Sequence, residues 1–470
     1  MRRLPLSLLV IAVLGLTAGC ALQLQQGAIS APVLPAQARS DPGRFLVITV
    51  RNEPVPAVAT PGSTPRGYGA AGLYAVSANA RATTHSLERD YRLREVSAWP
   101  IESLRVNCIV ARVPDLTARA ALITRLERDS RVESVQPLNQ FTTESASAAD
   151  GRAPSSRANR RPYLSLQVNL RELNVAQAHR LSEGAAVRVA VIDTGVDYRH
   201  PDLRGRIIAH SNFVAGDRGD FTGDRHGTQV AGVIAATDNG GLGLLGVAPK
   251  SRLIALKACW PLRQNAAEAA CNSFTLAQAL QAAITARADV VNLSLAGPPD
   301  PLLTRLIRFG MRRGIIYVGA APPVNSGLAH AFPVDIPGLL GVQSAEDAGG
   351  SSRHLLAPGH GILTLVPGGH YDFASGSSLA TAEVTGIVAL LLADGRRFAG
   401  ARVAQILSRS SRQLTTPAGI LTSVNACAAV ADALDRTGCR IMDEATGTRH
   451  DDERSHSQIR TVDIRPKAGT

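Results

Sequence analysis

Three side chains, far apart in the sequence, are of the types that together activate a serine hydroxyl. Asp193 follows the apolar run 187–192, His226 begins the segment 226–232, and Ser378 lies at the start of a long apolar segment. A serine hydroxyl is a weak nucleophile until a histidine removes its proton, and that histidine needs a carboxylate to fix its tautomer and stabilise its cation. Each residue alone has an ordinary structural explanation, since aspartates form turns and serines cap helices. Their conjunction predicts nucleophilic catalysis.

The elements that must position these residues alternate between strand and helix. Apolar segments typical of strands cover residues 187–192, 252–257, 289–293, 314–318 and 338–342. Helical segments cover 227–237, 274–287, 300–313, 378–394 and 400–408. This alternation predicts an α/β domain with a mostly parallel sheet and helices on both of its faces. Sites in such sheets form at the carboxyl ends of strands, where Asp193 stands, and a helix start such as that of Ser378 favours negative charge.

The N-terminal part of the chain follows a different pattern. Segments 45–50, 107–113 and 131–137 are predicted strands, and 116–130 is a predicted helix with Leu116, Ala120, Ile123 and Leu126 on one face. We therefore expect a small α+β domain over residues 43–141. The Gly- and Pro-rich stretch 54–90 is predicted to be a loop. Residues 142–161 predict an exposed linker suited to proteolytic cleavage, and the charged end 441–470 predicts disorder.

The three motifs together resemble the subtilisin-like serine peptidases. Asp-Thr-Gly-Val-Asp (193–197), His-Gly-Thr-x-Val-Ala-Gly (226–232) and Gly-Ser-Ser-x-Ala (376–380) occur in that family's order. The resemblance spans roughly residues 105–140 and 163–435. It implies a catalytic domain over 162–440 in which Ser378 attacks, His226 carries the proton and Asp193 orients the imidazole. The helix followed by Val-Glu-Ser-Val-Gln-Pro (132–137) resembles the end of a subtilase propeptide, so 43–141 would be the enzyme's own inhibitory propeptide.

The resemblance also implies a substrate-binding edge. Ser294, Leu295, Ala296 and Gly297 are similar to the family segment on which an extended peptide adds as a strand. Ala296 stands where glycine is usual in the family, which narrows the expected cleft. The polypeptide substrate and the propeptide are thus the expected partners of this edge.

One departure concerns the oxyanion. The family has an asparagine amide after a strand that ends in Ala-Gly, whereas this chain has Pro322 at that place. Loss of one oxyanion donor costs about a hundred- to a thousandfold in rate, which is short of abolition. Asn325, three residues later, and the hydroxyl of Ser377 are the candidate replacements. Ala382, where the family usually has proline, is expected to be tolerated.

The N-terminus has the pattern of an export signal. Arg2 and Arg3 precede an apolar stretch over residues 4–16, and small residues precede Cys20. This resembles the lipobox of bacterial lipoproteins. The resemblance implies a signal peptide over 1–19, lipidation of Cys20 and a tether over 20–42, so that the membrane is a partner through the lipid anchor. The alternative is a conventional cleaved signal. The expected location is the outer membrane or periplasm, with release after processing as a further alternative.

Export makes disulfides permissible, and the remaining cysteines are spaced for two local ones. Cys259 with Cys271 and Cys427 with Cys439 are close pairs, which leaves Cys108 unpaired. Cys-x-x-Cys motifs are absent, so no metal site is expected from the cysteines. Asp197, Asp202, Asp217, Asp220 and Asp224 include candidate ligands for structural calcium, yet no spaced oxygen-ligand loop is present, so no cofactor is required.

The charge of the chain does not indicate nucleic-acid binding. The formal net charge is +12, but the arginines are scattered and the densest basic run lies in the predicted linker. We expect a monomer. The leading hypothesis is an exported serine endopeptidase made as a proenzyme. The alternatives are a catalytically impaired scaffold lipoprotein of the same fold, motivated by Pro322, and an esterase with the same three residues.

Overall fold

The structure is a computed structural model, and it describes the two folded parts of the chain. The described residues are 34–53, 75–143, 163–214, 221–239, 241, 243–263, 266–322, 330–348, 353–416, 419–436 and 439, with the backbone of 146–147. The predicted signal peptide, Cys20, Asn325, Asp217, Asp220 and the C-terminal tail lie outside these residues.

A seven-stranded sheet with only parallel pairings forms the centre of the larger part, in the order β16-β15-β14-β12-β7-β9-β8. Its strands are β7 (Arg188–Asp193), β8 (Ile207–Asn212), β9 (Arg252–Lys257), β12 (Val290–Leu293), β14 (Ile316–Ala320), β15 (Leu340–Ser344) and β16 (Leu355–Ala357). Each of the five predicted strands is present within two residues of its expected ends. The predicted α/β fold is therefore confirmed.

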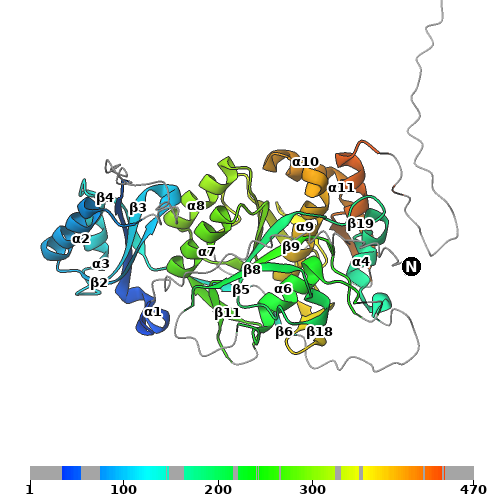
Figure 1. Ribbon diagram of the computed structural model, residues 1–470, viewed down its shortest axis with the longest axis horizontal. Helices are drawn as coiled ribbons and strands as arrows, with labels where there is room; N and C mark the ends of the chain where they lie inside the picture. The colour runs from blue at the N-terminus through cyan, green and yellow to red at the C-terminus, as the bar shows by residue number, and fades with distance from the viewer. Residues whose placement is uncertain are drawn as a thin grey trace, which may run out of the picture. The chain divides into compact units, whose positions relative to one another are not determined.

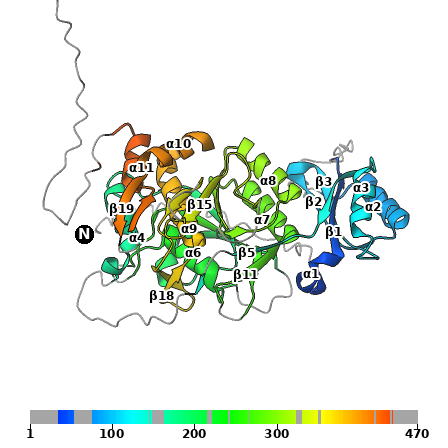
Figure 2. The same ribbon diagram turned by 180° about the vertical axis from the view of Figure 1, so that it is seen from behind.

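Helices cover both faces of this sheet (Figures 1 and 2). They are α4 (Val168–Glu172), α5 (Val175–Ala178), α6 (Arg225–Ala235), α7 (Ser273–Thr285), α8 (Pro301–Arg312), α9 (Ser377–Leu392), α10 (Gly400–Ser410) and α11 (Ala426–Ala433). Successive residues of a strand point to opposite faces. Val189 and Val191 accordingly pack with α6 and α9, whereas Ala190 and Ile192 pack with α7 and α8.

The N-terminal part is a four-stranded antiparallel sheet in the order β2-β3-β1-β4. Its elements are α1 (Gln37–Ser40), β1 (Phe45–Arg51), α2 (Ala78–Tyr91), β2 (Arg94–Ile101), β3 (Val106–Arg112), α3 (Arg119–Glu127) and β4 (Val132–Pro137). Helices α2 and α3 cover one face (Figure 1). On the other face Trp99 packs edge-on against Phe274 of α7, with ring centroids 4.5 Å apart.

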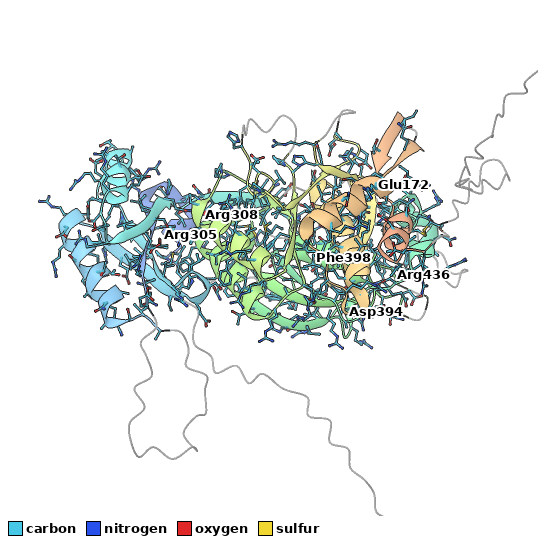
Figure 3. The ribbon with its side chains drawn as sticks, turned by 90° about the horizontal axis from the view of Figure 1, so that it is seen from above. Glu172, Arg305, Arg308, Asp394, Phe398 and Arg436 are labelled. Carbon is cyan, nitrogen blue, oxygen red and sulfur yellow. A yellow bond between two sulfur atoms is a disulfide. The ribbon has the colours of Figure 1, made fainter. Side chains whose placement is uncertain are left out.

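Asp300 is the polar centre of the contact between the two parts. Its carboxylate caps α8 by accepting from the Leu303 N–H at 2.9 Å, and it accepts from the side chains of Gln136 at 2.6 Å and Asn139 at 3.0 Å. Asp300 is 1% exposed, so these amides replace water around a buried charge. At the margin, Arg305 of α8, labelled in Figure 3, forms an ion pair with Glu133 of β4 at 3.4 Å.

Three expectations for the N-terminal part were wrong. Helix α2 lies within the predicted loop 54–90 and continues to Tyr91. It buries only Ala80, Thr84 and Leu87, and Ser77 caps it, so its apolar stripe is short. The predicted helix 116–130 begins only at Arg119, and Leu116 is 42% exposed instead of facing the core.

The third difference concerns the predicted linker. Instead of an irregular segment, its first residues form the end of β5 (Gln140–Thr143) and strand β6 (Ala146–Ser147). Their pairing partners lie in the larger part of the chain, more than a hundred residues away. Local composition does not indicate such a partner.

Candidate active site

Asp193 and His226 form a buried hydrogen-bonded pair. Asp193 ends β7, His226 is the second residue of α6, and the imidazole Nδ1 lies 2.6 Å from Asp193 Oδ1. The two side chains are 1% and 0% exposed. A carboxylate on Nδ1 selects the tautomer in which Nδ1 carries the proton, so Nε2 is the nitrogen that can accept one. This is the pairing that the sequence predicted for these two residues.

Two glycines allow the start of α6 to approach the end of β7. A Cβ on Gly227 would lie 2.5 Å from the Gly195 carbonyl oxygen, and a Cβ on Gly195 would lie 2.0 Å from the Phe221 carbonyl oxygen. In addition, the Gly227 N–H donates to Thr194 Oγ1 at 2.9 Å. The close backbone contact fixes the imidazole above the carboxylate.

A buried ion pair that was not predicted from the sequence supports the turn after Asp193. Lys257 Nζ lies 2.6 Å from Asp224 Oδ2, and the two side chains are 0% and 4% exposed. The same oxygen accepts from the Gly195 N–H at 2.6 Å. Asp224, considered above as a calcium ligand, thus has a lysine and a backbone amide as partners. The signal in the sequence was a lysine at the end of a strand whose four preceding residues are apolar.

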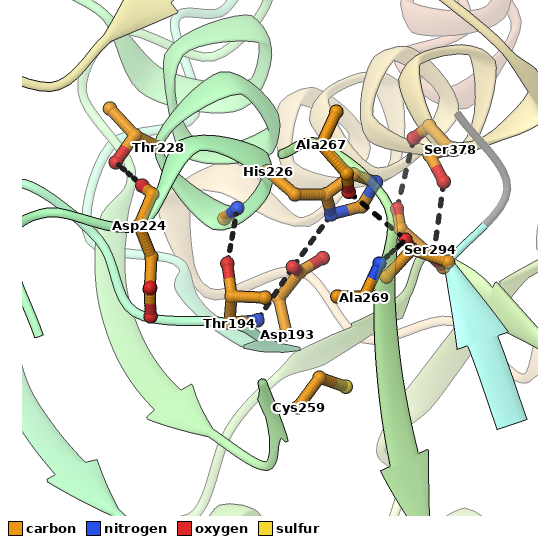
Figure 4. A network of polar contacts seen from close by, with 12 residues as sticks. Asp193, Thr194, Asp224, His226, Thr228, Cys259, Ala267, Ala269, Ser294 and Ser378 are labelled. Carbon is orange, nitrogen blue, oxygen red and sulfur yellow. Dashed lines mark hydrogen bonds and ion pairs between the residues drawn. The ribbon is translucent and has the colours of Figure 1, made fainter. Parts of the chain in front are cut away.

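Ser378 is the second residue of α9, and Figure 4 draws it in one close view with Asp193 and His226. Its hydroxyl donates to the Ser294 carbonyl at 3.0 Å, while the Ser294 hydroxyl donates to the Ser378 carbonyl at 2.9 Å. Asn292 holds Ser294 in turn, through an amide hydrogen bond of 2.9 Å. The preceding Gly376 has φ +135°, a conformation that favours glycine. The first turn of α9 is therefore anchored to the segment that follows β12.

Among the described residues, α9 together with the 3-10 turn that follows it (Ser377–Gly395) is apolar and long enough to cross a membrane, yet 89% of the apolar window is buried inside the fold. We interpret it as the core helix of the larger part. Its burial gives Ser378 a rigid support, because a side chain on a packed helix loses little precision to motion.

Only one of the two candidate oxyanion donors, Ser377, is among the described residues. Asn325 lies outside the described residues. The Ser377 hydroxyl oxygen accepts from the Ser344 N–H at 3.2 Å. Pro322 follows β14 and is half-buried, and a proline has no N–H to donate. The Ser378 N–H lies in the first turn of α9, where backbone N–H groups and the helix dipole favour negative charge.

Strand β5 fills the space between the edges of β11 (Ala269–Asn272) and β13 (Leu295–Ala296), which we call the groove. Strand β5 pairs in antiparallel fashion with β11 on one side and with β13 on the other. Strand β6 pairs with β18 (His370–Ser375), which leads into α9 and is backed by β17 (Ile362–Val366). Leu295 and Ala296, predicted to receive a strand, thus pair with one, and Gly297 lies against Phe141. Strand β5 thus pairs with the segment that follows Ser294, and β6 with the strand that leads into α9.

Both predicted disulfides are present in the structure. Cys259 of β10 (Cys259–Pro261) is bonded to Cys271 of β11, and Cys427 of α11 to Cys439. The Cys259–Cys271 disulfide joins β10 to β11, the strand that pairs with β5. The C-terminal hairpin of β19 (Arg412–Thr416) and β20 (Gly419–Ser423) was not predicted. Cys108 is a buried free thiol.

No group of three or more metal-binding side chains is found among the described residues. Asp197 accepts from the N–H groups of Arg199 and Gly368, and Asp202 accepts from the Leu244 N–H and the Tyr371 hydroxyl. These aspartates have protein donors.

The parallel sheet, with Asp193, His226 and Ser378 gathered near the carboxyl ends of its strands, defines a subtilisin-like serine peptidase fold. A model of the Subtilase family matches residues 184–427, which is more than half of the chain. The chain belongs to the subtilase family.

Relatives of known sequence and structure agree with this family. An intracellular serine protease of Paenibacillus polymyxa is 35% identical over 229 residues, covering 45% of this chain and 68% of that protein. Thermitase of Thermoactinomyces vulgaris is 31% identical over 254 residues, covering 52% of this chain and 88% of thermitase. Fervidolysin of Fervidobacterium pennivorans, a keratinolytic enzyme related to subtilisin, has a similar fold. The similarity has a TM-score of 0.60 at 21% identity and covers 82% of this chain and 60% of fervidolysin.

Glu383, one turn beyond Ser378 on α9, is a buried carboxyl group. It is 0% exposed and accepts from the Asn169 amide of α4 at 2.8 Å. Burial raises its pKa well above the usual value; the hydrogen bond from Asn169 lowers the pKa, and the charges of Glu346 and of Glu172, the latter labelled in Figure 3, raise it further. Protonation removes the cost of a buried charge.

We expect this carboxyl group to make the fold less stable as pH rises. The folded state retains the Glu383 proton over a pH range in which the unfolded chain has lost it. Its contribution to stability is therefore complete below the ordinary pKa of glutamate and declines toward the raised pKa, by up to about 1.4 kcal/mol per pH unit. Urea unfolding of the Ser378→Ala chain between pH 5 and 9 measures this slope. Glu383→Gln should flatten it, and Glu127→Gln, at an exposed position, should not. Equal slopes in all three chains would contradict the assignment.

Proposed function

We propose that this chain is an exported serine endopeptidase, made as a proenzyme and anchored through lipidated Cys20. The triad consists of Asp193, His226 and Ser378. The observation that carries the proposal is the antiparallel pairing of β5 with β11 and β13, because a groove that binds its own chain as a strand has the geometry needed for a peptide substrate.

The proposed reaction follows from the hydrogen bonds of the site. The Ser378 hydroxyl turns from the Ser294 carbonyl toward His226, loses its proton to Nε2 and attacks the peptide carbonyl carbon. Asp193 stabilises the imidazolium across the 2.6 Å contact. The C–N bond then breaks as His226 returns the proton to the leaving amine. Water, deprotonated by the same imidazole, releases the acyl group and restores Ser378.

The N-terminal domain is the first substrate in this proposal. Strands β5 and β6 pair with the groove on either side of Ser378, so the cut is expected at one of the three peptide bonds from Thr143 to Ala146. This interval lies at the start of the segment 142–161 that the sequence predicted to be processed. Before the cut, β5 occupies the groove and excludes other peptides.

Pro322 favours the competing function, an inactive scaffold with the same fold. The proline removes a side-chain donor to the oxyanion and lowers the expected rate, but the buried pair of Asp193 and His226 argues for retained chemistry. A scaffold has no need for an imidazole held on a buried carboxylate.

A fluorophosphonate probe tests the proposal directly. It forms a covalent adduct only with an activated serine, so the processed chain should be labelled at Ser378 and Ser378→Ala should not. Sequencing of the new N-terminus should identify a bond between Thr143 and Ala146. An unlabelled, unprocessed wild-type chain would favour the scaffold.

A further inference from the structure

The hydroxyl of Thr143 forms hydrogen bonds with two backbone groups of the segment that includes β11. Thr143 Oγ1 donates to the Ala267 carbonyl at 3.2 Å and accepts from the Ala269 N–H at 2.9 Å. All three residues are buried, at 7% exposure for Thr143, 2% for Ala267 and 1% for Ala269. Figure 4 draws Ala267 and Ala269 in one close view with His226 and Ser378. The backbone of Thr143 pairs with Leu295, and the preceding Ser294 is hydrogen-bonded to Ser378, so the contact lies one residue from the segment that holds the nucleophile.

The Thr143 hydroxyl extends the hydrogen bonding between β5 and β11 by one residue beyond their last backbone pair. Along β11, Ala270, Cys271 and Asn272 pair with the backbone of β5, and the pairing ends at Thr142. One residue further, the backbone of Thr143 pairs only with Leu295 of β13, and its side chain supplies the donor and the acceptor on the β11 side. A hydroxyl can do both at once, whereas an alkyl or carboxylate side chain cannot.

The element that reads the hydroxyl is held rigid. Strands β10 and β11 pair directly, the Cys259–Cys271 disulfide joins them, and the Leu262 N–H donates to the Glu268 carbonyl at 3.0 Å. The Ala267 carbonyl and the Ala269 N–H thus have fixed positions. A ligand without a hydroxyl would leave both of them buried without a partner, which is costly.

The other buried side chain of β5 fixes the register of this contact. Phe141 is 1% exposed and lies edge-on against Phe332, with centroids 5.1 Å apart. A Cβ on Gly297 would lie 2.4 Å from Phe141 Cδ1, so the glycine makes room for the ring. Thr142, between the two, is exposed. A peptide held by its aromatic side chain therefore presents its second following residue to Ala267 and Ala269.

We propose that the peptidase selects polypeptides with threonine or serine at the position of Thr143, two residues after a large apolar side chain. The proposal rests on the proposed function and names the substrate class of that site. The selected residue precedes the cut, and the two backbone groups of the β10–β11 hairpin determine the selection.

Matched peptides test the selection with one enzyme preparation. The substrates cover residues 138–147, as the natural sequence and with Thr143→Val, Thr143→Ser or Thr142→Val, and the processed full-chain product is titrated with the fluorophosphonate probe. We expect Thr143→Val to lower kcat/KM at least about tenfold, because it leaves two buried groups unpaired. Thr143→Ser and Thr142→Val should stay within about threefold of the natural peptide. Equal kcat/KM for the threonine and valine peptides would overturn the proposal.

A second readout does not require catalysis. In the uncut Ser378→Ala chain, amide hydrogen exchange at Ala269 should be slow, remain slow with Thr143→Ser added, and accelerate at least about tenfold with Thr143→Val. Unchanged exchange in the valine chain would contradict hydroxyl recognition even if the probe labels Ser378. If exchange accelerates in the valine chain but the probe fails to label the wild-type chain, the hydroxyl recognition is supported and the peptidase is rejected.

Discussion

Ser378→Ala should lower kcat for peptide hydrolysis by about a millionfold and leave the full-length precursor uncut. The size follows from triads in general, in which loss of the nucleophile removes the benefit of the whole relay. Because Ser378 lies in the buried first turn of α9, and alanine is smaller and a good helix former, the fold should persist. The turnover rate calculated from the total chain concentration and an immunoblot of the precursor measure the two effects.

Two companion variants make the result specific. His226→Ala should be nearly as inactive, since serine and histidine act as a unit. Ser408→Ala, at an exposed position of α10, should process and hydrolyse like the wild type. Cleavage of the Ser378→Ala precursor at the same bond would mean that another protease performs the processing. Retained hydrolysis by that variant would reject Ser378 as the nucleophile.

Lys257→Met should lower the free energy of unfolding by about 3–5 kcal/mol. The substitution leaves Asp224 as a buried carboxylate without its ammonium partner, and removing one member of a buried pair is far more costly than replacing both. Because Asp224 also holds the Gly195 N–H beside Asp193, we expect activity to fall together with stability. Urea unfolding, with every variant in the Ser378→Ala chain, measures the stability.

The exposed lysine pair of this fold is the matched control. Lys250 contacts Glu183 with both side chains partly in water, so Lys250→Met should cost about 1 kcal/mol or less. The double variant Lys257→Met, Asp224→Asn should recover part of the loss, because it removes both charges. A cost at Lys257 no larger than that at Lys250 would show that the buried pair is not a structural requirement.

The sequence predicted those parts of the molecule whose signals are local. Asp193, His226 and Ser378 each stand in a short segment with glycine neighbours and a clear strand or helix beside it. The five inner strands of the parallel sheet were predictable because they are mostly apolar runs, as expected for strands covered on both faces. The edge strands β8 and β16 were not predicted, because β8 is largely exposed and polar and β16 has only three residues.

Features that depend on distant partners were not predictable. Gln-Phe-Thr-Thr has one large apolar residue, and only pairing with β11 and β13 makes it a strand. The apolar stripe of α2 is too weak to predict a helix from the sequence, and it becomes a core face only because β1 and β3 pack against it. The partner of Lys257 lies 33 residues away in sequence, across a turn that no composition rule places.

The positions of the cysteines determine what the proposed cut would do to the molecule. Among the described residues, both disulfides lie after β6, and Cys108 in β3 has none. Hydrolysis between Thr143 and Ala146 would therefore leave the described halves without a covalent link. Their association would become bimolecular, maintained by contacts such as those of Gln136 with Asp300 and of Trp99 with Phe274. Dilution has no effect on an intact chain, but after the cut it would shift the population from a blocked complex to an open groove by mass action.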